Sequence, residues 1–249
     1  MSRYVTAILN ARLLDPASRR DETGGVLVVD GVIRELGPAV RGAPEGATVV
    51  DAEGACLAPG LVDLRVHFGE PGEEEKETFD SGSAAALAGG VTSLALLPDT
   101  DPAVDDPAMV EYVARRARRS RGVKVHPYAA LTHGLAGRQV AELGLLAEAG
   151  AVGFTDGPNP LADSGVFRRA LAYASSFAQP VVHRPEDTTL APHGVMHEGA
   201  LATRLGLAGI PAAVETIALE RDLQLVALTG ARYHAAQLST RGAVEAIRR

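Results

Sequence analysis

Alternating apolar and polar positions divide the chain into two stretches with different rhythms. Residues 4–56 hold short runs in which apolar and polar positions alternate, the pattern of half-buried strands. The runs lie at residues 5–9, 25–29, 32–36 and 48–50, and Asp30-Gly31 between two of them is a hairpin signal. Residues 1–57 are therefore predicted to form a small N-terminal β lobe.

From Ala58 onward, apolar strand-like runs alternate with helical stretches. The predicted strands cover residues 61–67, 91–97, 123–131, 151–155, 180–183 and 231–236, and the predicted helices cover 76–88, 107–119, 138–149, 163–177 and 211–229. Such alternation is typical of an α/β domain with a parallel sheet. Residues 58–249 are predicted to form this domain, and the pattern alone allows a doubly wound sheet or a barrel.

Composition narrows the class of protein. Apolar residues make up 46% of the chain and charged residues 22%, which is ordinary for a globular protein. The net charge of -7 argues against a nucleic-acid partner. The single cysteine, Cys56, cannot form an internal disulfide, which favours a cytoplasmic protein. Apolar runs long enough to cross a membrane are not found, so no membrane association is expected.

The most informative segment is residues 59–72, which reads PGLVDLRVHFGEPG. Polar side chains stand at alternate positions 63, 65 and 67, which a strand directs to one face. A histidine at position 65 could bind a divalent metal together with His67. The residue there is Arg65, a permanent cation without a free lone pair.

This segment resembles the first barrel strand of the dihydroorotase family within the amidohydrolase superfamily, which reads PGLVDxHxHxREPG. The resemblance continues over most of residues 50–249, through Lys76-Glu77-Thr78, residues 88–92, Pro98-Asp99-Thr100, His197-Glu198-Gly199, residues 205–211 and Leu238-Ser239-Thr240. It is strongest to noncatalytic dihydroorotase-like chains that accompany aspartate carbamoyltransferase in some bacteria. It implies a (β/α)8 TIM-type barrel. About six strand–helix units fit before Arg249, so an incomplete barrel is expected, either as a fragment of a longer chain or as a chain whose open edge another chain covers.

The resemblance also implies a degenerate site at the carboxyl ends of the strands. The candidate residues there are Arg65, His67, Asp99, Asp156, Arg184 and Gln237. Arg65 and Gln237 stand where the family has metal-binding histidines. An ungapped match from Glu186-Asp187 places Arg184 at a further such position, where a one-residue shift would place His183 instead. If the second aspartate of the family's F-[ST]-D-D-G motif is its ligand, Gly157 has replaced it. Gly69 replaces the substrate-binding arginine, and Asp99 replaces an asparagine. Since a catalytic zinc normally has three protein ligands, no metal or other cofactor is expected.

Two functional hypotheses remain. In the first, the chain is a catalytically inactive subunit of pyrimidine biosynthesis that oligomerises and supports the catalytic chain of aspartate carbamoyltransferase, with Arg65 paired to Asp99 or Asp156. An unclosed sheet would leave an edge and apolar surface for a partner. In the alternative, the chain is an active dihydroorotase that hydrolyses a cyclic amide with zinc held by His67, Asp156 and His183.

Overall fold

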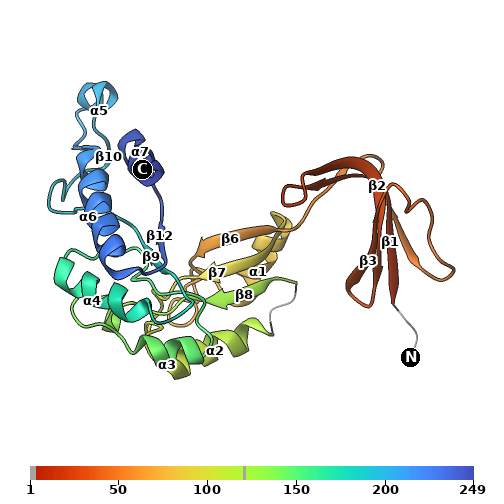
Figure 1. Cartoon of the computed structure of the whole chain (residues 1–249), viewed down its shortest axis with the longest axis horizontal. Coiled ribbons are helices and arrows are strands. Elements are labelled where there is room, and N and C mark those ends of the chain that lie inside the picture. The colour runs from red at the N-terminus through yellow and green to blue at the C-terminus, as the bar shows by residue number, and fades with distance from the viewer. Residues whose placement is uncertain (1–3, 120–121) are drawn as a thin grey trace. The chain divides into compact units, whose positions relative to one another are not determined.

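The computed structural model describes residues 4–119 and 122–249. They form two compact units, one ending at Leu61 and the other beginning at Val62. Each unit has its own strands and its own buried core, and Figure 1 traces the elements of both. None of the described helices is both long and apolar enough to span a bilayer.

The first unit is a five-stranded sheet. Its strands are β1 (Val5–Asp15), β2 (Arg20–Val29), β3 (Val32–Gly37), β4 (Thr48–Asp51) and β5 (Cys56–Leu57). The order is β3-β2-β1-β4, with β5 also paired to β1. Asp30 and Gly31 both have positive φ, at 51° and 78°, so the predicted hairpin between β2 and β3 is confirmed. Its small core contains Ala11, Leu13 and Val26.

The second unit alternates strands with helices, as the pattern predicts. Its strands are β6 (Leu61–Val66), β7 (Val91–Leu96), β8 (Lys124–Pro127), β9 (Val181–His183), β10 (Met196–His197), β11 (Gly209–Ile210) and β12 (Tyr233–Ala235). Its α-helices are α1 (Phe79–Ala88), α2 (Pro107–Ala117), α3 (Leu143–Glu148), α4 (Ser164–Ala174), α5 (Ala200–Leu205), α6 (Ala213–Thr229) and α7 (Arg241–Arg248), and a 3-10 turn, η1, covers His133–Leu135.

The larger strands follow one another in chain order and in parallel. Strands β6, β7 and β8 form one sheet, with β7 and β8 parallel, and lie side by side in Figure 1. Parallel bridges at Phe154 continue the series from Ala129 to Val181 in β9, and β9 pairs in parallel with β12. An α/β fold with sequential parallel strands is therefore present, and the carboxyl ends of these strands gather their following loops on one side.

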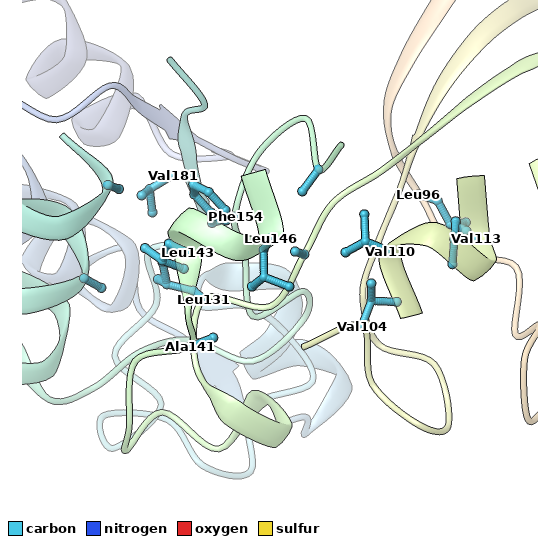
Figure 2. Packing of buried hydrophobic residues seen from close by; sticks show 14 of the residues in the cluster. Leu96, Val104, Val110, Val113, Leu131, Ala141, Leu143, Leu146, Phe154 and Val181 are labelled. Carbon is cyan, nitrogen blue, oxygen red and sulfur yellow. The ribbon is translucent and has the colours of Figure 1, made fainter. Parts of the chain in front are cut away.

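Side chains on the two sides of this strand series pack into separate clusters. The larger cluster joins the strands to the helices, and Figure 2 shows its members from β7, α2, α3 and the adjoining loops. Those labelled are Leu96, Val104, Val110, Val113, Leu131, Ala141, Leu143, Leu146, Phe154 and Val181. The smaller cluster consists of Ala95, Leu97, Tyr128, Val182 and Ala236. Alternation along the strands sends neighbouring residues, such as Leu96 and Leu97, into different clusters.

The structure corrects two element predictions. The helix predicted over residues 138–149 covers only Leu143–Glu148, because the segment before it pairs with residues 131–133. There, His133 N donates to Gln139 O at 2.9 Å, and Ala141 N donates to Leu131 O at 3.0 Å. The strand predicted over residues 151–155 is reduced to the bridges at Phe154. Helices α5 and α7 were not among the predicted elements.

Glu215 joins the start of α6 to the start of α7. Its carboxylate accepts hydrogen bonds from the backbone and the hydroxyl of both Ser239 and Thr240, at 2.8–3.1 Å. Burial opposes ionisation, but these donors together hold the pKa of Glu215 below its usual 4.5.

We expect Glu215→Gln to lower the free energy of unfolding at pH 7 by about 1–2 kcal/mol, because the replacement loses charge-assisted hydrogen bonds. A carboxylate whose pKa is lower in the folded than in the unfolded state stabilises the folded protein at pH values above its unfolded-state pKa. This stabilisation is lost as the pH falls through the folded-state pKa. The difference in the free energy of unfolding between the variant and the wild type should therefore become smaller from pH 7 to pH 4, as measured by urea denaturation. Glu245→Gln, at an exposed site on α7, is the control. A difference that widens on acidification would contradict the assignment.

Candidate functional site

The predicted site residues lie at the carboxyl ends of the parallel strands. Arg65 and His67 lie at the end of β6, Asp99 after β7, Asp156 after the Phe154 bridge, Arg184 after β9, and Gln237 after β12. Polar side chains from distant parts of the sequence therefore meet at one end of the strand series, which we call the mouth. In α/β folds this is where ligand sites are built.

Arg65 reaches across the mouth to backbone rather than to a carboxylate. Its Nη2 donates to Gly157 O at 3.1 Å, while its Nη1 is buried without a hydrogen-bond partner. Burial lowers the pKa of Arg65, the charge of Asp99 opposes that shift, and the charge of Arg184 adds to it. The prediction that Arg65 pairs directly with Asp99 or Asp156 is wrong for the described residues, because both carboxylates have other partners.

His67 is the partner of Asp99. Its Nδ1 lies 3.1 Å from Asp99 Oδ1, and its Nε2 lies 3.9 Å from Glu73 Oε2. The imidazole therefore stands between two carboxylates at the edge of the mouth. Asp99 is thus the residue that orients His67.

Asp156 is engaged by the loop that follows β8. It is buried, and its carboxylate accepts from Leu131 N at 3.0 Å, from Thr132 N at 2.8 Å and from the Thr132 hydroxyl at 2.5 Å. Burial raises the pKa of Asp156, and the hydrogen bonds from Thr132 and Leu131 oppose the shift. The side chain therefore anchors the loop that follows β8.

His183 has no free ring nitrogen. Leu161 N donates to its Nε2 at 2.9 Å, so that nitrogen is unprotonated, and its Nδ1 donates to Asp222 Oδ2 at 2.6 Å. The ring is 3% exposed, and both of its polar atoms are committed inside the protein. The lone pair that a metal would need is already used.

Asp222, which was not among the predicted site residues, is the common hydrogen-bond acceptor for His183, Tyr233 and Arg221, which together form a buried network. It is fully buried in the middle of α6 and also accepts from Tyr233 Oη at 2.8 Å and from Arg221 Nη2 at 2.7 Å. Burial raises the pKa of Tyr233, and the charge of Asp222 raises it further. The run Glu220-Arg221-Asp222 is typical of a solvated helix face, so the burial of Asp222 could not be read from the local sequence.

Arg184 and Gln237 border a pocket of about 330 Å³ between the mouth and the β10–β11 pair. Arg184 forms an ion pair with Glu186, and its Nη1 donates to Pro158 O at 3.3 Å. Gln237 is exposed and has a left-handed backbone, with φ of 58°. Neither side chain offers the imidazole nitrogen that a zinc site would use at its position.

Gly69 follows β6 in a turn that admits no side chain. Its φ is +82°, and a Cβ atom there would lie 2.6 Å from Glu73 O. Glu73 N donates to Gly69 O at 2.7 Å, which closes the turn. The backbone conformation at this position is therefore one that glycine alone adopts without strain.

The zinc ion that the family resemblance implies does not fit these residues. Two of the matching positions carry guanidinium groups, and His183 is held by Asp222 and Leu161. The alternative ligand set of His67, Asp156 and His183 is not brought together. Throughout residues 4–119 and 122–249, no group of three or more His, Cys, Asp or Glu side chains is arranged to hold a metal ion.

Comparison with known proteins identifies one family. Residues 54–243 match the family described as Dihydro-orotase-like. The chain is 45% identical over 241 residues to a protein named dihydroorotase from Pelobacter propionicus, covering 97% of this chain and 57% of that protein. It is also 45% identical to a dihydroorotase from Syntrophotalea carbinolica, with 97% and 56% covered. The chain spans a little over half the length of these relatives.

Solved structures share the fold. An L-hydantoinase (dihydropyrimidinase) from Arthrobacter aurescens superposes with a TM-score of 0.79 at 22% identity, covering 96% of this chain and 54% of that one. A D-hydantoinase superposes with a TM-score of 0.73 at 22% identity, with 98% and 54% covered. At this level of identity the likeness concerns the fold alone.

Proposed function

The chain belongs to the dihydroorotase-like family, and from this premise we propose that it is a member without competent metal chemistry. Its role would be to support an assembly of pyrimidine biosynthesis rather than to open or close a ring. The observation that carries the proposal is the occupation of the mouth by guanidinium groups, Arg65 on Gly157 O and Arg184 on Pro158 O. A permanent cation opposes a dication and provides no lone pair for it.

The order and the parallel direction of the strands support an incomplete (β/α) barrel. We infer that β6, β7, β8, the Phe154 bridge, β9 and β12 correspond to six successive strands of an eight-stranded (β/α) barrel, because they follow in chain order and in parallel. The side chains of Val62 and Leu64 in β6 are 62% and 50% exposed. A closed barrel with a surrounding ring of helices would cover such residues.

The partner we propose is the catalytic chain of aspartate carbamoyltransferase. The loss of metal donors at Arg65, Arg184 and Gln237 supports this choice, because a dihydroorotase-like chain without them resembles the noncatalytic chains that accompany this transferase. Size-exclusion chromatography with light scattering tests it, with the chain alone and mixed with the transferase of the same organism. The expected result is self-association or a mixed complex. A compact monomer that ignores the transferase would refute the assembly role.

The alternative function is an active dihydroorotase that hydrolyses a cyclic amide with one zinc ion. The 45% identity to proteins named dihydroorotase favours it. To bind zinc, His183 would have to lose its hydrogen bond with Asp222 or with Leu161. Asp156 would have to lose its hydrogen bond from Thr132. Each of these hydrogen bonds is buried. We therefore rank it second.

Metal content together with activity tests the two functions against each other. We expect the purified chain to retain fewer than about 0.1 zinc per chain after dialysis, because a catalytic zinc needs about three protein ligands. We also expect no dihydroorotase activity when zinc is added. Elemental analysis and an assay in both reaction directions provide the readouts. About one retained zinc per chain with measurable turnover would overturn the inactive assignment in favour of the alternative.

A further inference from the structure

Strand β6 is the outer strand of its sheet. The order β6-β7-β8 leaves it paired on one side, and Figure 1 shows it as the outermost of the three. Among the strands that the structure describes, none pairs with its other edge. The side chains of Val62 and Leu64 beside this edge are exposed. An open edge of this length with exposed apolar side chains is a template for a further strand.

The direction of the backbone groups shows which residues of β6 face the open edge. Leu97 N donates to Val66 O at 2.8 Å, so the backbone groups of Val66, and of Leu64 two residues earlier, face the β7 side. Because this direction alternates along a strand, the backbone groups of Asp63 and Arg65 face outward. Arg65 N donates to the carboxylate of Asp63, at 3.0 Å from Oδ1. A local side chain therefore stands in for the missing strand at this one position.

The sequence of β6 is self-complementary in one antiparallel register. A two-fold axis at Leu64 places this residue opposite its own copy, Asp63 opposite Arg65 of the second copy, and Val62 opposite Val66 of the second copy. Opposite charges and apolar pairs both stabilise facing positions of antiparallel strands. An axis at Asp63 or at Arg65 would instead bring like charges together. The charges of the strand therefore favour a single register.

The same register provides partners for the outward backbone groups. Asp63 of each copy faces Arg65 of the other, and both residues direct their N–H and C=O groups to the open edge. These two facing pairs form about four hydrogen bonds between the copies. The N–H of Arg65 then exchanges the Asp63 carboxylate for a backbone carbonyl. The contact is isologous and uses the open edge of β6 in both copies, so it closes at two copies.

We propose that two copies of this chain form a dimer by antiparallel pairing of β6 with β6, with the two-fold axis at Leu64. A second copy is the occupant that matches this edge in charge, in apolar side chains and in backbone direction together. The inference rests on the incomplete barrel within the proposed function, whereas the loss of metal chemistry and the transferase partner are tested separately.

Disulfide cross-linking of the full chain tests the register. The exposed Cys56 is replaced by serine, and the two variants compared are Leu64→Cys and Val62→Cys, both at exposed positions. In the proposed register, the two Cα atoms at position 64 lie about 4.5 Å apart, within the range of a disulfide. Those at position 62 lie about 14 Å apart, which makes Val62→Cys the matched control. We expect mild oxidation to convert most of the Leu64→Cys chain to a covalent dimer, and at least about five times less of the control.

Light scattering on charge variants provides a second test, which does not depend on the folding of the cysteine variants. The wild type should have twice the mass of one chain, and Asp63→Arg should shift it toward the monomer by placing two arginines opposite each other. The double variant Asp63→Arg, Arg65→Asp restores opposite charges and should restore the dimer. Equal cross-linking at both positions, or preferential cross-linking at position 62, would overturn the register. A wild type that is monomeric alone but joins the transferase would overturn the dimer and leave the proposed function standing.

Discussion

Replacing Asp222 by alanine is expected to lower the free energy of unfolding by about 3–5 kcal/mol, the usual cost of removing one partner from a buried ion pair. The carboxylate is fully buried and accepts from His183 Nδ1, Tyr233 Oη and the Arg221 guanidinium. Alanine would leave these donors without an acceptor in the core. Equilibrium unfolding in guanidinium chloride measures the change.

Glu220→Ala is the matched control for this experiment. Glu220 lies on the same helix, is exposed and pairs with Arg249 at the surface. Its loss should cost no more than about 1 kcal/mol, as is usual for surface ion pairs. A cost for Asp222→Ala as small as that of the control would show that the hydrogen bonds from His183, Tyr233 and Arg221 to Asp222 do not stabilise the fold.

A chain with donors restored at four positions is expected to bind zinc. The changes are Arg65→His, Gly157→Asp, Arg184→His and Gln237→His. Aspartate tolerates the left-handed backbone at Gly157, where φ is +64° and an added Cβ would meet Asp99 at an ordinary 3.5 Å. We expect retained zinc to rise from below about 0.1 to about one per chain, because four donors make a complete set. Elemental analysis after dialysis is the measurement.

Two controls show whether zinc binding depends on the added metal donors or on the removal of positive charge. Arg65→His alone still lacks the other donors and should stay below about 0.1 zinc per chain, with no activity. The double variant Arg65→Gln, Arg184→Gln removes both cations without adding imidazoles and should also stay zinc-free. A folded quadruple variant that binds no zinc would show that backbone geometry, rather than the donor set, excludes the metal.

The spacing of apolar residues predicted those helices and strands whose buried positions recur at the regular period of the element. Helix α2, predicted over residues 107–119, begins at Pro107 after the N-cap Asp106, whose side chain accepts from Ala108 N. The helix predicted from residue 138 starts late because its first residues pair with another segment, and such tertiary pairing leaves no local pattern. Helix α5 is short, whereas α7 carried a local signal that was missed, because Thr240 caps it and Ala243 and Ala246 lie buried three residues apart.

The site was predictable as a set of positions but not as a set of contacts. Strand ends correctly placed Arg65, His67 and Asp99 in one mouth, since parallel strands end on the same side. The partner of Arg65 could not be read from the sequence, because it is a backbone carbonyl of Gly157. The commitment of His183 to Asp222 depends on two residues 39 positions apart, which only the packed structure brings together.

The turn at Gly69 limits what a single substitution can restore. In the family that the chain resembles, this position holds the arginine that would pair with the substrate. Here the backbone has settled at φ of +82°, and Glu73 O stands 2.6 Å from where a Cβ atom would be. An arginine introduced at position 69 would therefore strain the turn, and the residues around Glu73 would have to rearrange before the side chain could be accommodated.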